Sequence, residues 1–150
     1  MKQSAGMVDI SEKKITKRTA RARATVKFPP KAFTLLLREG SPKGDVFETA
    51  RVAGIMAAKS TPQIIPFCHP LELGKTRIDF EIVKSRSEVK IFSEVIYSGK
   101  TGVEMEALTA VAVAALTIYD LMKWADKGIA ILEILLDYKS GGKSGVFQRR

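Results

Sequence analysis

The segment TGVEMEALTAVAVAALTIYDLMKWADKG, residues 101–128, predicts a long helix that dominates the fold of this chain. From Ala107 to Tyr119 it contains only apolar residues, small residues and threonines. A helix that packs on one sheet needs only one apolar stripe, so this helix has a spare apolar face, which a second chain or loops of the same chain would cover. Gly128 is placed to cap the helix. The apolar run is shorter than the roughly 18 residues of a membrane span, so we expect no transmembrane helix.

Alternating apolar and polar residues on both sides of this helix predict β-strands. In residues 19–28, TARARATVKF, the apolar side chains share one face and the basic side chains share the other. Residues 76–84 and 88–97 alternate in the same way around a short turn, which is typical of a hairpin. Residues 129–139 form the last predicted strand.

Two further helices are predicted between the first strand and the hairpin. Residues 29–40 begin with prolines and end with glycine, and residues 43–60 begin with Asp45 and Glu48 in the spacing of a capping box. The order is therefore strand, helices, strand, strand, helix, strand. This order predicts an α+β fold of the ferredoxin-like, split βαβ type, with an antiparallel sheet and helices packed on one face.

Length and composition indicate one folded domain. The 150 residues are 45% hydrophobic, which is enough for a core, and we expect a single domain over residues 1–150. Within it, residues 1–17 are predicted to be a flexible arm and residues 139–150 a glycine- and lysine-rich tail. The amino-terminal segment lacks the apolar core of a signal peptide, and Cys68 is the only cysteine, so we expect a reducing, cytoplasmic setting. The single histidine excludes a multi-histidine zinc site within one chain.

The formal net charge of +9 predicts an anionic partner, unless it serves only solubility. A phosphorylated metabolite and a nucleic acid both fit this charge. The basic face of residues 19–28 favours a nucleic-acid-binding module, which we keep as the alternative function. Such a module needs aromatic stacking positions on the sheet or a recognition helix, and the sequence contains no such motif. A third interpretation is that the protein has a purely structural role. This interpretation does not explain why the loop around His69 is ordered.

Asp120 and Lys123 lie three residues apart near the end of the long helix, so their side chains can meet. An exposed pair of this kind stabilises a helix by only about 0.2–0.5 kcal/mol, which favours a role in chemistry. If the fold gathers Lys127, Lys139 and Lys143, their mutual repulsion would lower each ammonium pKa toward the range of a general base. Along an unbroken helix Asp120 lies about 21 Å from Glu106, too far to act on one centre within one chain.

Two short motifs resemble catalytic sites and do not satisfy their requirements. In PFCHP the neighbouring Cys68 and His69 point in opposite directions if the chain is extended, so they cannot form a nucleophile–base pair. The flanking prolines instead indicate an ordered loop. A P-loop requires a glycine five residues before its Gly-Lys-Ser, but in this chain Asp137 occupies that position before the Gly-Lys-Ser of GGKSG. Too few residues follow this motif to form the helix that a P-loop also requires.

Five segments, in this order along the chain, resemble the MoaC family, which contains the cyclic pyranopterin monophosphate synthases. They are MVDIS (7–11), KGDV (43–46), AGIMAAKSTPQIIPFCHPL (53–71), TGVEMEALTAVAVAALTIYD (101–120) and GGKSG (141–145). The resemblance implies conversion of 3′,8-cyclo-7,8-dihydro-GTP to cyclic pyranopterin monophosphate with release of pyrophosphate. It also implies a hexamer built as a trimer of dimers, with active sites between subunits. It implies no resident cofactor, although a magnesium ion could accompany the triphosphate.

The same resemblance assigns roles to individual residues. Lys123 matches the catalytic lysine, a general acid or base, and Asp120 matches its electrostatic partner or a second proton carrier. The residues that match substrate contacts are Phe67, Cys68, His69, Met105 and Glu106, and those that match basic residues for the phosphates are Arg18, Lys43 and Lys139. Trp124 departs from the family, which more often has a small residue directly after the catalytic lysine.

Overall fold

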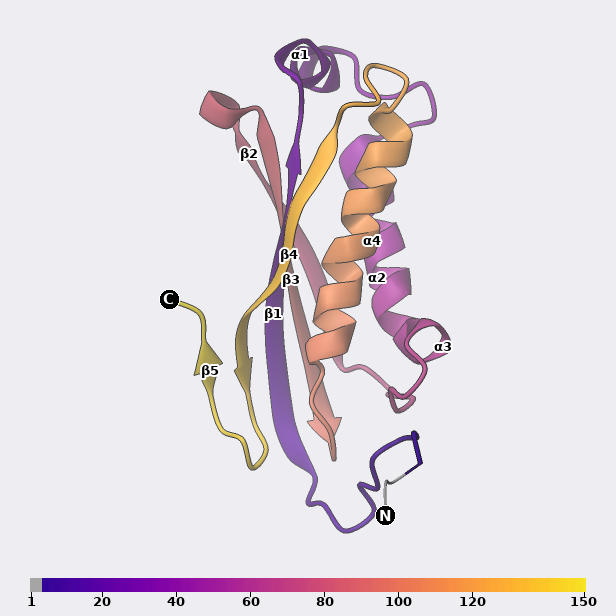
Figure 1. Ribbon diagram of the computed structural model, residues 1–150, viewed down its shortest axis with the longest axis vertical. Coiled ribbons are helices and arrows are strands. Elements are labelled where there is room, and N and C mark those ends of the chain that lie inside the picture. The colour runs from indigo at the N-terminus through magenta and orange to yellow at the C-terminus, as the bar shows by residue number, and fades with distance from the viewer. Residues whose placement is uncertain (1–3) are drawn as a thin grey trace.

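An antiparallel sheet carries the helices on one of its faces in the computed structural model, which describes residues 4–150 (Figure 1). The strand order is β2-β3-β1-β4-β5, and each neighbouring pair is antiparallel. This confirms the predicted α+β, ferredoxin-like architecture. The strands are β1 (Thr16–Lys27), β2 (Lys75–Val83), β3 (Glu88–Gly99), β4 (Ala130–Ser140) and β5 (Phe147–Gln148).

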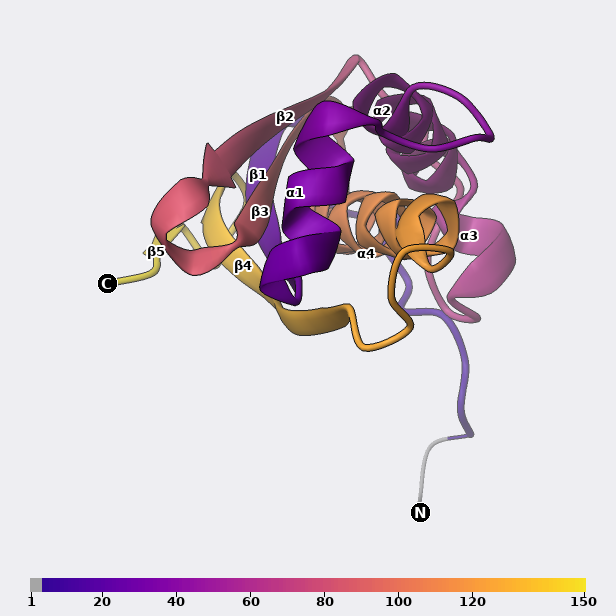
Figure 2. The ribbon, with the colours of Figure 1, turned by 90° about the horizontal axis from the view of Figure 1, so that it is seen from above.

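The two longer helices lie side by side on the same face of the sheet (Figures 1 and 2). The α-helices are α1 (Pro30–Arg38), α2 (Val46–Lys59), α3 (Thr61–Ile64) and α4 (Glu104–Met122), and a 3₁₀ turn, η1 (Lys84–Arg86), joins β2 to β3. As the capping-box spacing predicts, Asp45 caps α2 by accepting a hydrogen bond from the Glu48 N–H at 2.8 Å. Helix α3 was not predicted. Pro62 lies in its first turn, where N–H groups have no partner within the helix, so the proline costs no helical hydrogen bond.

Small side chains let α4 pack closely on the sheet. In β1 the buried side chains Ala20, Ala22, Ala24 and Val26 alternate with the arginines of the other face, as the period of two requires. The buried residues of α4 include Ala107, Ala110, Val111, Ala114, Ala115 and Ile118. By length and composition α4 could cross a membrane, but 56% of its most apolar window is buried in this fold. Such burial is typical of a core helix.

The end of α4 differs from the prediction. The helix stops at Met122, with Lys123 as its C-cap residue, so Gly128 does not cap it. The Ala125 N–H bonds to the Met122 carbonyl oxygen at 2.9 Å and tightens the last turn. The Tyr119 hydroxyl then donates to the Lys127 carbonyl oxygen at 2.9 Å. These contacts begin the loop that leads into β4 before Gly128 is reached.

The sheet extends into both segments that the sequence predicted to be irregular, the arm and the tail. Residues 1–3 of the predicted arm lie outside the described residues, residues 4–15 form neither helix nor strand, and β1 already begins at Thr16. At the other end, β5 pairs with Tyr138 and Lys139 of β4. Part of the predicted tail therefore forms the sheet edge, which composition alone did not indicate.

Gly54 allows α2 to approach both α4 and β2. A Cβ atom at this position would collide with the Ile78 side chain and lie 2.8 Å from the Ala110 carbonyl oxygen. We expect Gly54→Ala to lower the free energy of unfolding by about 1–3 kcal/mol, measured by urea denaturation. Helix propensity alone predicts stabilisation by about 1 kcal/mol, so an unchanged or higher stability would contradict the close packing of α2.

Candidate active site

Three of the predicted site residues meet at the carboxyl end of α4, and we call them the lysine–aspartate cluster: Lys43, Asp120 and Lys123. The Lys43 Nζ lies 3.1 and 3.0 Å from the two carboxylate oxygens of Asp120. The Lys123 Nζ lies 2.9 Å from Asp120 Oδ1. Gly44, with φ of 132°, permits the tight turn from Ser41 to Gly44 that carries Lys43. All three side chains are about half exposed.

The charges of this cluster stabilise one another. Hydrogen bonds from Lys123 and Lys43 hold the pKa of Asp120 below its usual value, and Asp120 raises the pKa of Lys123. At neutral pH the carboxylate is therefore ionised and the Lys123 ammonium protonated. The condition under which the lysines would lower one another's pKa is not met, because Lys127 precedes β4 and Lys139 lies near its other end, and the 11 residues of β4 span about 35 Å. Lys123 is thus a proton donor in the free chain.

The predicted contact residues around the histidine meet at the other end of α4. Phe67, Cys68, His69, Met105 and Glu106 line one cavity of about 260 Å³, which we call the histidine cavity. The amino-terminal arm and the segment before α4 complete its wall. The His69 Nε2 lies 2.8 Å from the Val8 carbonyl oxygen, so this nitrogen carries the proton and donates it.

Burial changes the ionisation of two groups in the histidine cavity. Glu106 is only 3% exposed, and this burial raises its pKa to about 7, with a smaller contribution from the Glu104 carboxylate. Burial also raises the pKa of the Cys68 thiol, and the charge of the Glu106 carboxylate raises it further. The thiol is therefore protonated at neutral pH, which excludes a thiolate nucleophile in the free chain.

A second cavity lies where the arm, β1 and the tail meet, and we call it the arginine cavity. Its volume is about 580 Å³, and its lining is Glu12, Lys13, Lys14, Thr16, Arg18, Gly142, Lys143 and Ser144. Arg18 is 9% exposed, and its Nε has no hydrogen-bond partner among the described residues. A buried, unsatisfied guanidinium nitrogen favours an anion as its ligand. A Cβ atom at Gly142, where φ is 78°, would collide with this guanidinium.

Lys139 lies beside the arginine cavity but does not line it. Its Nζ donates a hydrogen bond to the Ser144 hydroxyl, so it holds the GGKSG segment at the cavity. The structure thus places Lys139 next to the cavity that Arg18 lines. Both cavities adjoin the amino-terminal arm, at the end of the molecule opposite the lysine–aspartate cluster (Figure 1).

The predicted site residues therefore form two sets separated by the length of α4. Glu106 and Asp120 are 14 residues apart on one unbroken helix, which corresponds to about 21 Å. Glu104, Lys13 and Val8 also line the histidine cavity and were not predicted as site residues. Glu104 lies in the first turn of α4, where a carboxylate is favoured by the helix dipole without any role in a site. No local pattern indicates where the irregular amino-terminal arm will dock.

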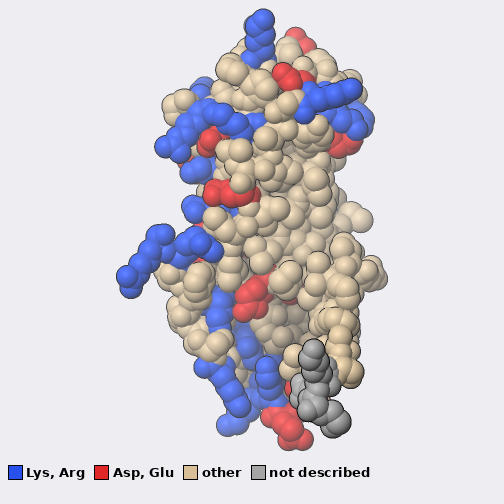
Figure 3. Space-filling view, viewed as in Figure 1, with Lys and Arg blue, Asp and Glu red and all other residues tan. Residues whose placement is uncertain are grey.

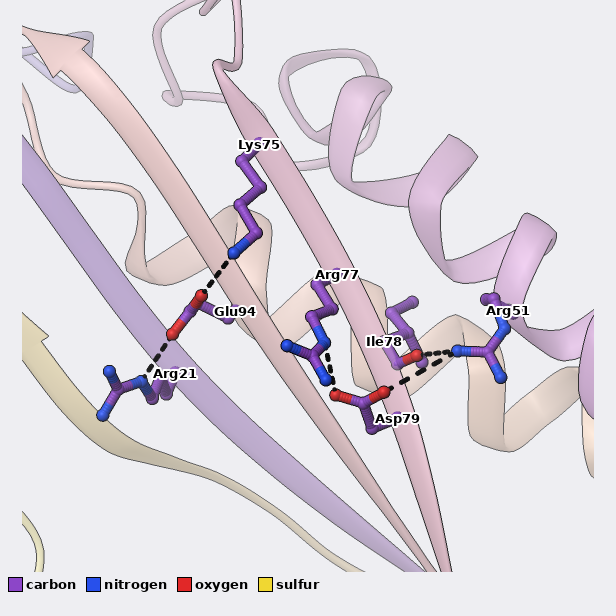
Figure 4. A network of polar contacts seen from close by, with 7 residues as sticks. All are labelled: Arg21, Arg51, Lys75, Arg77, Ile78, Asp79 and Glu94. Atoms are coloured by element: carbon purple, nitrogen blue, oxygen red, sulfur yellow. Dashed lines mark hydrogen bonds and ion pairs between the residues drawn. The ribbon is translucent and has the colours of Figure 1, made fainter.

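The outer face of the sheet carries most arginines of β1, and carboxylates pair with them (Figure 4). Glu94 accepts from Arg21 at 2.8 Å and from Lys75 at 3.1 Å. Arg77 pairs with Asp79 at 2.8 Å. These pairs reduce the net positive charge on the face that favoured nucleic-acid binding.

The buried carboxyl group of Glu106 is expected to make stability depend on pH. Between pH 4.5 and about 7 the unfolded chain loses this proton while the folded chain keeps it. The free energy of unfolding should therefore fall as the pH rises through this range, by at most about 3 kcal/mol. Glu106→Gln should flatten this part of the profile in urea denaturation at pH 5 to 8, and the exposed Glu81→Gln should not. A Glu106→Gln profile equal to that of the wild type would refute the raised pKa.

Comparison with known proteins identifies the family. The sequence model of the MoaC family matches residues 7–142. The chain is 52% identical over 145 residues to the cyclic pyranopterin monophosphate synthase of Methylobacterium nodulans, covering 97% of this chain and 91% of that protein. It is 55% identical over 148 residues to the protein of the same name from Desulforamulus reducens, covering 99% and 90%. With the family match extending over most of the chain, this protein belongs to the MoaC family.

Proposed function

We propose that this protein is a cyclic pyranopterin monophosphate synthase, a lyase of molybdenum cofactor biosynthesis. The substrate is 3′,8-cyclo-7,8-dihydro-GTP, and pyrophosphate leaves as the product forms. The observation that carries this proposal is identity above 50% with enzymes of that name along nearly the whole chain. The cationic lining of the arginine cavity agrees with a triphosphate substrate.

The lysine–aspartate cluster supplies the proton transfers of the reaction. Opening one ring, forming another and closing a cyclic phosphate each require protons to move, and Lys123 carries a proton at neutral pH. Asp120 keeps that ammonium charged and oriented. Lys43 donates to the same carboxylate, and its ammonium group has a further N–H with which it can bind a phosphate oxygen while Lys123 transfers its proton.

In this proposal the histidine cavity binds the ring system of the substrate, and the residues at the arginine cavity bind its phosphates. The histidine cavity has apolar walls from Phe67 and Met105, and the buried Glu106 can hydrogen bond with the edge of a heterocycle. Cys68 and His69 complete the contact to that ring. Arg18 and Lys139 hold the phosphates, with the positive charge that these require. The reaction needs no resident redox cofactor, and a magnesium ion can accompany the triphosphate as part of the substrate.

A complete active site requires two chains, because the cluster and the cavities lie too far apart in one chain. The helices leave apolar residues exposed, including Val52, Met56 and Leu116, and Figure 3 shows a broad surface without charged residues over α4. Two copies related by a twofold axis near the middle of α4 would bring Asp120 of one chain beside Glu106 of the other. Three such dimers would make the hexamer. A fully active monomer in analytical ultracentrifugation would contradict this arrangement.

The proposed setting is the cytoplasm. The substrate is a nucleotide-derived intermediate, and the free Cys68 thiol is compatible with a reducing compartment.

Turnover of the cyclised nucleotide tests the proposed function directly. The purified protein should release pyrophosphate from 3′,8-cyclo-7,8-dihydro-GTP, with the pterin product identified by mass spectrometry. GTP itself should give neither product, because its ring system lacks the bond from which the pterin forms. Absence of pyrophosphate release from the cyclised substrate would refute the proposal.

A further inference from the structure

The amino-terminal MVDIS segment forms an ordered turn to which the proposed function assigns no role. The Ser11 N–H and hydroxyl group both donate to Asp9 Oδ1, at 2.9 and 2.5 Å. The Lys13 N–H then bonds to the Ile10 carbonyl oxygen at 3.1 Å. An Asx turn followed by a backbone turn fixes the direction in which the chain reaches Lys13.

Two contacts dock this turn on the folded domain. The His69 ring donates to the Val8 carbonyl oxygen at 2.8 Å, and the Lys100 Nζ donates to the Ser11 carbonyl oxygen at 3.0 Å. One contact ties the arm to the histidine loop, and the other ties it to the segment between β3 and α4. The position of Lys13 is thus set by the domain as well as by the arm.

Lys13 lies at the junction of the two cavities. Among the described residues, it is the one that lines both the histidine cavity and the arginine cavity. It forms no ion pair with a described carboxylate. The arginine cavity has four cationic lining residues against the single carboxylate of Glu12. A phosphate chain that extends from one cavity into the other would therefore pass the Lys13 ammonium, whose charge no carboxylate of the described residues neutralises.

We propose that Lys13 binds the phosphate chain of the substrate at this junction, and that the turn beginning at Asp9 positions it there. The inference rests on the proposed function and adds a residue to its substrate-binding machinery. The amino-terminal arm then forms part of the active site, with Lys13 holding the phosphates while the ring occupies the histidine cavity.

Neutralising Lys13 tests the proposal against a neighbouring lysine. Lys13→Met should raise KM for the cyclised nucleotide about tenfold and change kcat less than twofold, since a charge-assisted contact is lost without loss of a proton carrier. Inorganic pyrophosphate should bind about tenfold more weakly in titration calorimetry. Lys17→Met is the matched control, because it removes the same charge from an exposed position that lines neither cavity. Lys13→Arg should retain most of the affinity.

The positioning role of Asp9 is tested in a double-mutant cycle. Asp9→Ala alone should weaken pyrophosphate binding by a smaller factor, and it should have no further effect when Lys13 is already methionine. Independent, additive effects would overturn the role of the turn. Equal behaviour of Lys13→Met and Lys17→Met, or a loss of kcat at constant KM, would overturn the role of Lys13. Pyrophosphate binding by wild-type protein is measured without turnover, so failure of this inference is distinguishable from failure of the proposed function.

Discussion

Lys123→Arg is expected to be as inactive as Lys123→Ala, with kcat reduced by about 10²–10⁴-fold in either variant. The guanidinium group keeps the positive charge beside Asp120 but cannot release its proton near neutral pH. A lysine that only binds phosphate would tolerate the change, because guanidinium also binds phosphate well. Single-turnover release of pyrophosphate measures the chemical step. Near wild-type turnover by Lys123→Arg would reassign Lys123 to phosphate binding.

Lys43 provides the matched control for this experiment. It contacts the same carboxylate and is equally exposed, but we assign it to phosphate binding. Lys43→Arg should therefore retain activity within about tenfold of the wild type, whereas Lys123→Arg should not. If both arginine variants are inactive, the geometry of the cluster rather than proton transfer would explain the loss.

The pH dependence of turnover offers an independent test of Lys123. Asp120 raises the pKa of Lys123, so removing the carboxylate in Asp120→Asn should lower that pKa. If the protonated amine is the acid, the alkaline limb of the kcat profile should move to lower pH in this variant. An unchanged alkaline limb would show that another group supplies the proton.

Mixing two impaired variants is expected to restore activity if, as proposed, each active site takes its groups from two chains. Lys123→Ala damages the lysine–aspartate cluster, and Glu106→Gln damages the histidine cavity. In a mixed dimer both defects fall on one site and the other site is intact. Equal amounts of the two chains, randomly paired by co-expression, should give about a quarter of the wild-type number of intact sites.

The control for this complementation is a pair of variants with both defects in the same set. Lys123→Ala mixed with Asp120→Asn should show no more activity than the mean of the two variants measured separately, because every site then lacks one member of the cluster. Native mass spectrometry of differently tagged chains verifies that mixed dimers form. Mixed dimers without recovered activity would show that the two sets do not share a site.

Sequence patterns predicted most of the sheet and the longer helices. The period of two in β1, with alanines on one face and arginines on the other, is a local property of a half-buried strand. The pairing of Asp120 and Lys123 followed from helical spacing alone, and the structure places their charged atoms 2.9 Å apart. In each case the residues that interact are neighbours along the chain.

Contacts between distant segments could not be predicted in this way. The hydrogen bond from His69 to Val8 and the collision that excludes a side chain at Gly142 both depend on how irregular segments pack. The capping role given to Gly128 failed for a similar reason, because the tightened last turn and the Tyr119 hydroxyl fix the loop earlier in the chain. Such contacts leave no periodic signal.

The sequence by itself determined most of the helices and strands and the proximity of Asp120 to Lys123, since helix and strand periods depend only on neighbouring side chains. Only the tertiary structure decided that these residues form two sets at opposite ends of α4, and that the amino-terminal arm joins two cavities through Lys13. The physical reason is that burial and charge compensation arise from segments brought together by packing. The raised pKa of Glu106 and the unsatisfied Nε of Arg18 exist only in the folded chain.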